Sequence, residues 1–425
     1  MTSHLTNGTL SDVTRPVVVV AEEIAESGLE RLRERYDVDV AVDVPRDDLL
    51  RRLAGAHALI VRSATKVDAE MIAAAPELRV IGRAGTGVDN VDVEAATRSG
   101  IVVVNAPTSN TLSHAEHVLA LLLAQARNIP AADRALRAGE WRRSRYQGVE
   151  LHGKTLGILG LGRVGTIVAQ RASAFGMTIV AWDPFVSRDR ARQMGVELRD
   201  SVEAVLEDAD VVSILLPKTP ETTNILSAER LRRMKPGARV INTARGGLVD
   251  EAALAEAVRD GRLSGAAIDV FETEPPKDSP LFDLEQVVVT PHLAGSTAEA
   301  QDKAGATIAE QVDLALRGEF VPFAVNVAAG EIPETLSPFL PLAETLGRLF
   351  TALAGSVPDL LEIAYQGTIA DSDTRILTLS ALKGLFADVV TASAPNRAAV
   401  PFSPWAVRRR ATRSPAARAS RRAAN

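Results

Sequence analysis

The chain of 425 residues contains no cysteine, 4% aromatic residues and no long apolar run. The absence of cysteine excludes a disulfide framework, a thiolate metal site and a cysteine nucleophile. The longest uninterrupted apolar segment, residues 118–124, is far shorter than the ~18 residues that a membrane-spanning helix needs. The polar N-terminus also lacks the apolar segment of a signal peptide. We therefore expect a cytoplasmic protein without a membrane partner.

Acidic residues are missing from the last 35 residues, which contain eight arginines and no lysine. Because the whole chain has a net charge of -6, residues 1–390 carry -14. An acidic body disfavours nucleic-acid binding, since phosphate contacts need lysine and arginine. In the basic tail, Phe402 and Trp405 do not interleave with the arginines as a base-stacking surface requires. We expect no nucleic-acid partner.

Short β-branched runs alternate with helical patterns in two series, joined by a long helical pattern over residues 111–127. This alternation is typical of parallel sheets covered on both faces by helices. A shorter helix–strand–helix pattern follows residue 330, and the tail beyond residue 390 lacks apolar periodicity. The fold class expected is α/β, with two doubly wound parallel-sheet domains and a partial third α+β domain.

One glycine-rich motif follows a strand pattern and opens a helix: Gly160-Leu161-Gly162-Arg163-Val164-Gly165. Its glycines permit a tight turn, close approach of a pyrophosphate, and close helix–strand packing. Asp183 ends the next strand 18 residues after Gly165, near the ~20 expected for the acid that binds a ribose. The pattern predicts dinucleotide binding. NAD is favoured over NADP because a carboxylate repels a 2′-phosphate, although the nearby Arg188 weakens that preference.

Three polar side chains follow strand patterns of the second series. His292 lies just past a strand over residues 287–290, and Arg245 and Glu274 follow two other strands. Ligands of open α/β sheets bind at such strand ends. A histidine can take the hydroxyl proton in hydride transfer from an alcohol, an arginine can hold a carboxylate, and a glutamate can stabilise a protonated imidazole. We expect one site rather than three unrelated loop charges.

The remaining histidines are His4, His57, His114, His117 and His152. His114 and His117 lie three residues apart on one helix face, and a metal pair is conceivable. Two helix histidines without further ligands are more often packed or solvated, and we expect no metal.

Four segments resemble, in order and spacing, those of the D-isomer-specific 2-hydroxyacid dehydrogenases. They are residues 160–165, 242–250, 269–275 and 290–297. Arg62-Ser63 and residues 83–92 and 105–111 are most similar to the phosphoglycerate dehydrogenase branch of that family. The resemblance covers about residues 16 to 390.

This resemblance implies a division of the chain. We expect a disordered lead (1–15), a substrate-binding domain of flavodoxin-like fold (16–108) completed by a return helix (300–330), and a Rossmann NAD-binding domain (109–299). A partial intervening domain (331–390) and a basic, disordered tail (391–425) follow. Closure of the substrate-binding domain by a hinge is part of the family pattern.

The resemblance also implies the site. Arg245 would bind the substrate, His292 would be the acid and base, and Glu274 would be the partner of His292. The implied cofactor positions are Thr86, Gly160, Gly162, Arg163, Val164, Gly165, Asp183, Leu216, Thr243, Ala244, Arg245, Asp269, His292, Leu293, Ala294 and Gly295. The implied substrate positions are Arg62, Ser63, Gly87, Asn110 and Arg245.

The implied activity is NAD-dependent oxidation of 3-phosphoglycerate to 3-phosphohydroxypyruvate, the first step of L-serine biosynthesis. A homodimer or homotetramer is expected, with residues 134–147 at the subunit contact. A hydroxypyruvate or glyoxylate reductase, or another D-2-hydroxyacid dehydrogenase, would share the catalytic residues. The alternative of another class is a protein that resembles the corepressors of this superfamily, which sense NAD and bind peptides.

Two departures from the family stand out. Leu216 replaces the His or Thr that often precedes the proline beside the adenine pocket, which removes a side-chain hydrogen bond. The resemblance ceases near Val390, whereas the long phosphoglycerate dehydrogenases continue to a serine-binding ACT domain. We expect a truncated or frame-shifted product rather than a natural tail, and no inhibition by serine.

Overall fold

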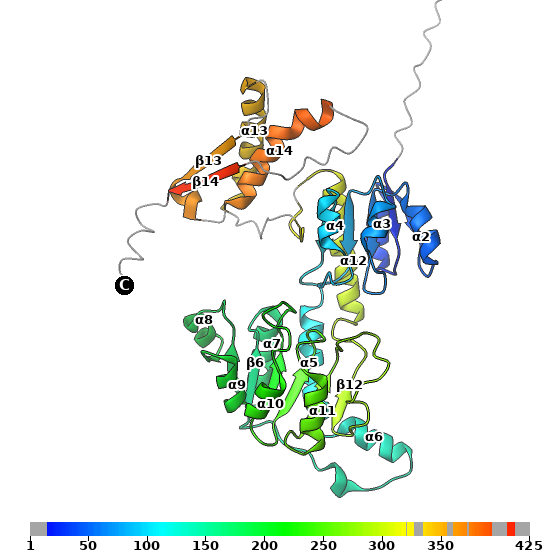
Figure 1. Ribbon diagram of the computed structural model, residues 1–425, viewed down its shortest axis with the longest axis vertical. Helices are drawn as coiled ribbons and strands as arrows, with labels where there is room; N and C mark the ends of the chain where they lie inside the picture. The colour runs from blue at the N-terminus through cyan, green and yellow to red at the C-terminus, as the bar shows by residue number, and fades with distance from the viewer. Residues whose placement is uncertain are drawn as a thin grey trace, which may run out of the picture. The chain divides into compact units, whose positions relative to one another are not determined.

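The computed structural model describes residues 15–319, 321–326, 335–354, 360–371, 374–392 and 406–412. They divide into two compact units: residues 110–301 form one, and the described residues before 110 and after 301 form the other (Figure 1). Most of the expected lead (1–15) lies outside the described residues. The finer domain boundaries drawn from the sequence stay predictions.

The discontinuous unit contains a five-stranded parallel sheet in the order β2-β1-β3-β4-β5. This is the order of flavodoxin-like sheets. The strands are β1 (Val17–Val20), β2 (Asp37–Val40), β3 (Ala58–Val61), β4 (Val80–Arg83) and β5 (Val102–Asn105). The helices are α1 (Glu26–Arg33), α2 (Arg46–Leu53), α3 (Ala69–Ala73), α4 (Val93–Arg98) and most of α12 (Ala298–Leu316). Apolar side chains of α2, α3 and α4 cover one face of the sheet, and those of α1 and α12 cover the other.

The helix α12 is fixed to this sheet by contacts with residues far away in the sequence. A Cβ added at Gly28 would lie 2.7 Å from the carbonyl oxygen of Gly305, so the two backbones touch. The Tyr36 hydroxyl donates to the buried Asp313 carboxylate at 2.8 Å, and burial together with this bond raises the pKa of Tyr36 to about 12. The chain therefore returns to its first sheet after building the second.

The second unit contains a seven-stranded parallel sheet in the order β12-β11-β10-β9-β6-β7-β8. Its strands are β6 (Thr155–Leu159), β7 (Thr178–Trp182), β8 (Glu197–Leu198), β9 (Val211–Ile214), β10 (Arg239–Asn242), β11 (Gly265–Ile268) and β12 (Val287–Val289). The strand order reverses between β6 and β9, as in dinucleotide-binding sheets. The predicted α/β class with doubly wound parallel sheets is confirmed.

Helices cover both faces of this second sheet. They are α5 (Thr111–Ala126), α7 (Arg163–Ala174) and α8 (Arg188–Gln193) on one face, and α9 (Val202–Asp208), α10 (Ala228–Arg233) and α11 (Glu251–Arg259) on the other. The register pairs Ile214 with both Leu159 and Asn242, and Ile268 with both Asn242 and Val289. The carboxyl ends of five neighbouring strands thus lie at one level of one edge.

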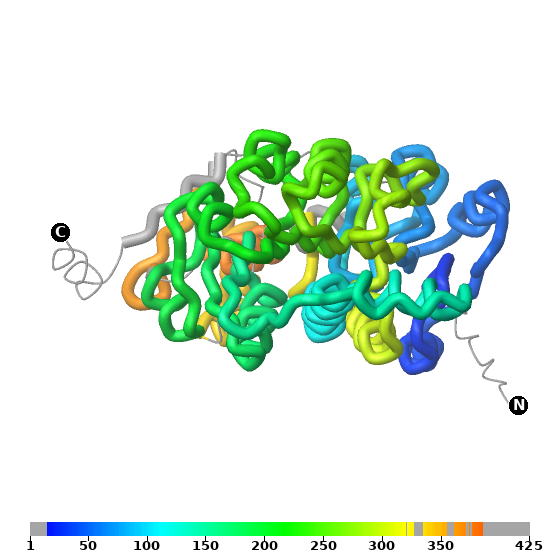
Figure 2. Tube along the Cα trace, turned by 90° about the horizontal axis from the view of Figure 1, so that it is seen from below, coloured from blue at the N-terminus to red at the C-terminus, as the bar shows by residue number. Residues whose placement is uncertain are grey.

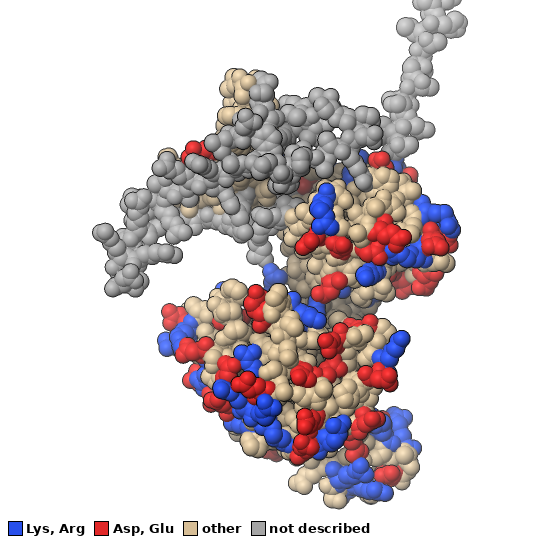
Figure 3. All heavy atoms as spheres, viewed as in Figure 1, with Lys and Arg blue, Asp and Glu red and all other residues tan. Residues whose placement is uncertain are grey.

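Helix α6 (Ile129–Arg137) and the 3₁₀ turn η1 (Arg143–Tyr146) stand apart from the sheet (Figures 1 and 2). Large apolar side chains are exposed along this segment, with Ile129 at 53%, Leu136 at 57% and Trp141 at 77%. Lysine and arginine side chains gather at the same end of the unit (Figure 3). Within the part of the chain that the structure describes, no helix is both long and apolar enough to span a membrane.

A smaller α+β cluster follows. It contains η2 (Ser337–Phe339), α13 (Leu340–Ala354), β13 (Leu360–Gln366), η3 (Gly367–Asp371) and α14 (Arg375–Ala392). Its core is built from Leu336, Tyr365, Ala370, Ile376 and Leu377.

The strand β14 (Ala406–Thr412) corrects one prediction. It pairs in parallel with β13, from Leu360 opposite Ala406 to Gln366 opposite Thr412. The expectation that residues 391–425 contain no ordered element is therefore wrong for this segment. Strand pairing joins backbone groups, and an unpaired strand edge can accept a segment without apolar periodicity. The other residues of the tail beyond α14 lie outside the described residues.

Candidate active site

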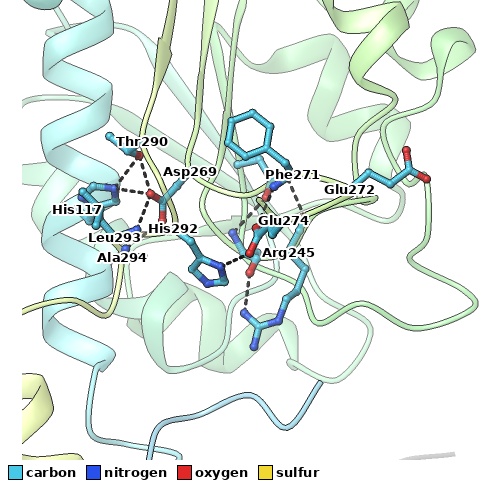
Figure 4. A network of polar contacts seen from close by, with 12 residues as sticks. His117, Arg245, Asp269, Phe271, Glu272, Glu274, Thr290, His292, Leu293 and Ala294 are labelled. Atoms are coloured by element: carbon cyan, nitrogen blue, oxygen red, sulfur yellow. Dashed lines mark hydrogen bonds and ion pairs between the residues drawn. The ribbon is translucent and has the colours of Figure 1, made fainter. Parts of the chain in front are cut away.

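Three polar loops at the carboxyl edge of the seven-stranded sheet carry the predicted catalytic side chains (Figure 4). Arg245 follows β10, Glu274 follows β11 and His292 follows β12. The His292 Nδ1 atom lies 2.7 Å from Glu274 Oε2. The His292 side chain is 44% exposed, so its ring can reach a bound molecule. Figure 4 shows the three side chains pointing into the same region.

The Glu274 carboxylate is held in its ionised form. Burial alone would raise its pKa, but hydrogen bonds from His292 and from the Phe271 amide, at 3.0 Å, outweigh that effect and leave the pKa below its usual value. An ionised carboxylate only accepts hydrogen bonds, so Nδ1 of His292 carries the proton. The lone pair of the neutral ring then lies on Nε2, the atom that faces away from Glu274.

Asp269 organises the turn that contains His292. Its side chain is fully buried, and its two oxygens accept hydrogen bonds from His117 Nε2 at 3.1 Å, Thr290 Oγ1 at 2.6 Å, and the amides of Leu293 at 2.8 Å and Ala294 at 2.9 Å. Burial raises the pKa of Asp269, but these four bonds outweigh it, and the pKa lies below its usual value. The site thus contains a second ionised carboxylate.

The backbone of His292 adopts the left-handed region, with φ of 53°. A residue with a Cβ costs about 1–2 kcal/mol there and persists only where its surroundings hold it. The His292 amide donates to the carbonyl oxygen of Asp269 at 2.8 Å, while the next two amides donate to the Asp269 carboxylate. Asp269 therefore fixes the turn on both sides of the strained residue.

Two histidines of α5 contact residues of the candidate site, although we expected no role for them there. His114 Nε2 lies 2.9 Å from Thr243 Oγ1, and His117 bonds to Asp269. Burial, with a smaller effect of the Arg245 charge, lowers the pKa of His114 to about 4, so this ring is neutral at physiological pH. Both histidines lie in the first two turns of α5, directly after the predicted substrate position Asn110. That position in the sequence could have indicated that they lie near the site. Among the described residues, no group of three or more potential metal ligands occurs.

The glycine-rich turn has the shape that a dinucleotide requires. Gly160 has a φ of 100°, and a Cβ at Gly165 would lie 2.2 Å from the Gly160 carbonyl oxygen. A Cβ at Gly162 would meet no atom within 4 Å, so the space over this residue is open. Asp183 Oδ2 accepts from the Leu161 amide at 2.8 Å, which holds the acid against the turn. The arrangement fits a bound pyrophosphate and ribose.

Most other predicted cofactor positions lie at the same edge of the sheet. Leu216 follows β9, with its side chain near Gly160. A Cβ at Gly295 would lie 2.8 Å from Asn110 Nδ2, so the beginning of α5 reaches the His292 turn. The remaining positions are Arg163 and Val164 at the start of α7, Thr243 and Ala244 after β10, and Leu293 and Ala294 after β12. Arg188 is exposed and pairs with Asp200.

Four predicted positions lie in the discontinuous unit, after the carboxyl ends of β3 and β4: Arg62, Ser63, Thr86 and Gly87. Glu22 accepts hydrogen bonds from the amides of Arg62 and Thr65 at 2.9 and 2.8 Å. Asn90 donates to the carbonyl oxygens of the same two residues at 2.8 and 2.7 Å. The loop that carries Arg62 and Ser63 is therefore held from two sides.

Comparison with known proteins gives the family. A family model for the NAD binding domain of D-isomer specific 2-hydroxyacid dehydrogenases matches residues 119–294, and one for the D-3-phosphoglycerate dehydrogenase intervening domain matches residues 335–398. The D-3-phosphoglycerate dehydrogenase of Mycobacterium tuberculosis is 53% identical over 375 residues, which cover 88% of this chain and 71% of the relative. The chain belongs to the D-3-phosphoglycerate dehydrogenase family.

Other relatives agree with this assignment. The D-3-phosphoglycerate dehydrogenase of Methanocaldococcus jannaschii is 44% identical over 379 residues, covering 88% of this chain and 72% of the relative. A crystal structure of a Thermus thermophilus protein covers 73% of this chain and 99% of its own, with 39% identity and a TM-score of 0.68. The D-lactate dehydrogenase of Aquifex aeolicus, solved with NAD and lactic acid, has 28% identity and a TM-score of 0.62 over 71% of this chain and 96% of its own. The predicted family and NAD cofactor are confirmed.

Two glycine substitutions separate folding from cofactor binding. We expect Gly165→Ala to lower the melting temperature of the protein without NAD, because overpacking against the Gly160 carbonyl costs about 1–3 kcal/mol. Gly162→Ala should leave that temperature unchanged, since its Cβ meets open space, and should weaken NAD binding about ten-fold or more by filling the approach of the pyrophosphate. Thermal denaturation and NAD titration measure both. Wild-type NAD affinity in Gly162→Ala would contradict the assignment of the turn.

Proposed function

We propose that this chain oxidises 3-phosphoglycerate to 3-phosphohydroxypyruvate with NAD, the first step of L-serine biosynthesis, at the carboxyl edge of the seven-stranded sheet. The observation that carries the proposal is the contact of 2.7 Å between His292 and the ionised Glu274, with Arg245 on the neighbouring loop. These are the groups that the oxidation of a 2-hydroxy acid needs: a base, a partner that stabilises its charged form, and a cation for the carboxylate.

His292 acts as the base of the reaction. Nδ1 holds its proton toward Glu274, so Nε2 accepts the proton of the C2 hydroxyl group. The imidazolium that results lies against a carboxylate, which stabilises its charge as the alcohol becomes a ketone. In the reverse direction, the same Nε2–H donates to the carbonyl oxygen. The second ionised carboxylate, Asp269, holds the turn on which the ring sits.

Arg245 holds the carboxylate of the substrate. Its backbone is fixed from both sides, because Asn242 Nδ2 donates to the Arg245 carbonyl oxygen at 2.9 Å and the Ala244 amide donates to Asn242 Oδ1 at 3.1 Å. A guanidinium binds a carboxylate through two parallel hydrogen bonds, which fixes orientation as well as position. Arg62, Ser63, Gly87 and Asn110 are the further positions that we assign to the substrate.

The residues of the glycine-rich turn and the strand ends would hold NAD. Gly160, Gly162 and Gly165 provide the turn, and the carboxylate of Asp183 would accept the ribose hydroxyl groups. When bound, NAD would supply the acceptor for the hydride, with its two electrons, that leaves C2. The other positions assigned to the cofactor are Thr86, Arg163, Val164, Leu216, Thr243, Ala244, Arg245, Asp269, His292, Leu293, Ala294 and Gly295.

We also propose a cytoplasmic homodimer or homotetramer. The segment of residues 134–147 supports a subunit contact, because Leu136 and Trp141 leave much of their apolar surface exposed. Aromatic residues and arginine are enriched in protein interfaces relative to the rest of the surface, and this segment contains both.

The activity is tested by comparing substrates with the purified chain. We expect NAD to be reduced with 3-phosphoglycerate, and NADH to be oxidised with 3-phosphohydroxypyruvate at a kcat/KM at least ten-fold above that with glyoxylate. A preference for glyoxylate or hydroxypyruvate would identify a reductase of the same family instead. No turnover with any 2-oxo acid would favour an NAD-sensing binding protein.

His292→Gln should lower kcat by 100-fold or more, because a general acid–base group contributes about 10²–10⁴-fold. The amide can still form a hydrogen bond to Glu274 but cannot exchange a proton. Steady-state rates measured with NAD binding as a control for folding test this. A kcat within a few-fold of the wild type would refute the assignment of His292 as the base.

Arg245→Lys should raise the KM for 3-phosphoglycerate by about ten-fold or more, while the charge is kept, because an ammonium cannot reproduce the planar pair of hydrogen bonds. Arg232→Lys, on the surface at the end of α10, is a matched control and should leave KM unchanged. If Arg245→Lys has a normal KM, Arg245 does not hold the carboxylate.

A further inference from the structure

We propose that His117 is a positioning residue for the proton transfer: through the buried carboxylate of Asp269, it holds the turn that presents His292. The inference rests on the proposed function, because His292 must be the base. His117 lies on α5, and its ring nitrogen Nε2 is 3.1 Å from Asp269 Oδ1 (Figure 4). Figure 4 shows His117 on the α5 side of Asp269 and the His292 ring on the other side.

Asp269 joins a helix to the catalytic turn. One of its oxygens, Oδ1, accepts from the His117 ring, the Thr290 hydroxyl and the Leu293 amide, while Oδ2 accepts from the Ala294 amide. Three of these four donors belong to the turn itself and move with it. His117 is the donor that comes from outside the turn, so its hydrogen bond holds Asp269 at a fixed place relative to α5.

The buried Asp269 carboxylate depends on the hydrogen bond from His117 to stay ionised. A carboxylate without exposed surface stays ionised only while hydrogen bonds replace the lost water. Of the four hydrogen bonds that Asp269 accepts, the one from His117 lowers its pKa the most, against the opposite effect of burial. When that bond is lost, protonation or a shift of Asp269 becomes easier, and the amides of Leu293 and Ala294 lose part of their acceptor.

Loss of the bond from His117 would change the conformation of His292, because the backbone of His292 is in the left-handed region with φ of 53°. A strained residue relaxes when the bonds that hold it weaken. The ring would then leave the position in which Nδ1 meets Glu274 and Nε2 meets the hydroxyl proton. Misplacement of a catalytic group by about 1 Å can cost up to 10²-fold in rate.

The test measures the rate constant of a single turnover, with enzyme and NAD in excess over 3-phosphoglycerate. His117→Leu removes the donor, and His117→Asn keeps a polar group that is too short to reach Asp269. His117→Gln restores an N–H at about the place of the imidazole Nε2. We expect the rate constant to fall about ten-fold or more in the Leu and Asn variants and to return to within about three-fold of wild type in the Gln variant. The KM for 3-phosphoglycerate should stay unchanged in all three.

A purely structural role would give a different result. Partial unfolding removes active sites, but while folded enzyme stays in saturating excess over 3-phosphoglycerate it changes neither the amplitude nor the rate constant of the single turnover. Gln125→Leu is the matched control, since Gln125 is a buried polar residue of the same helix that does not contact Asp269. It should keep the wild-type rate constant.

Three outcomes would overturn the inference: a wild-type rate constant in His117→Asn or His117→Leu, no recovery in His117→Gln, or an equal loss in Gln125→Leu. If His117→Leu does not fold, the Asn and Gln pair alone decides. Failure of the proposed function is distinguishable, because the wild-type chain itself would then not reduce NAD with 3-phosphoglycerate.

Discussion

A parallel strand that is covered on both faces by helices is apolar over most of its length, so polar side chains gather mainly where such strands end. The candidate active site depends on this constraint. The strands β10, β11 and β12 end at the same level of the sheet, as their register shows. The loops that follow them bring Arg245, Glu274 and His292 together although 47 residues separate the first from the last. The same edge carries the glycine-rich turn after β6, at the reversal of strand order, so one sheet positions both this turn and the three polar side chains.

At this edge of the sheet, three ionisable neighbours of His292 are each held in one protonation state. Burial keeps His114 neutral, with a pKa of about 4. Hydrogen bonds keep Glu274 and Asp269 ionised even though burial opposes it. His292, partly exposed and in contact with an ionised carboxylate, is the side chain that we propose as the acid and base. A site that must move one proton benefits when its neighbours do not titrate near the same pH.

The sequence was sufficient for features that local pattern determines. Strand periodicity predicted both sheets, the polar segments after the strands predicted one shared site, and the family resemblance implied Glu274 as the partner of His292. Features set by contacts between distant segments were missed. His117 and Asp269 are 152 residues apart, and a histidine on a helix carries no mark of the carboxylate that it will meet. The pairing of β14 with β13 was missed for a similar reason, because backbone hydrogen bonds leave little trace in composition.

The turn around His292 and the buried Asp269 each need the other. A carboxylate without solvent contact costs several kcal/mol unless donors surround it, and a buried amide such as that of Ala294 costs about 1–3 kcal/mol when it has no acceptor. The amides of Leu293 and Ala294 supply donors, and Asp269 in turn gives them an acceptor. Neither arrangement is stable alone, so the left-handed backbone at His292 follows from satisfying both. The strained backbone at His292 is thus maintained by the hydrogen bonds of the Asp269 side chain.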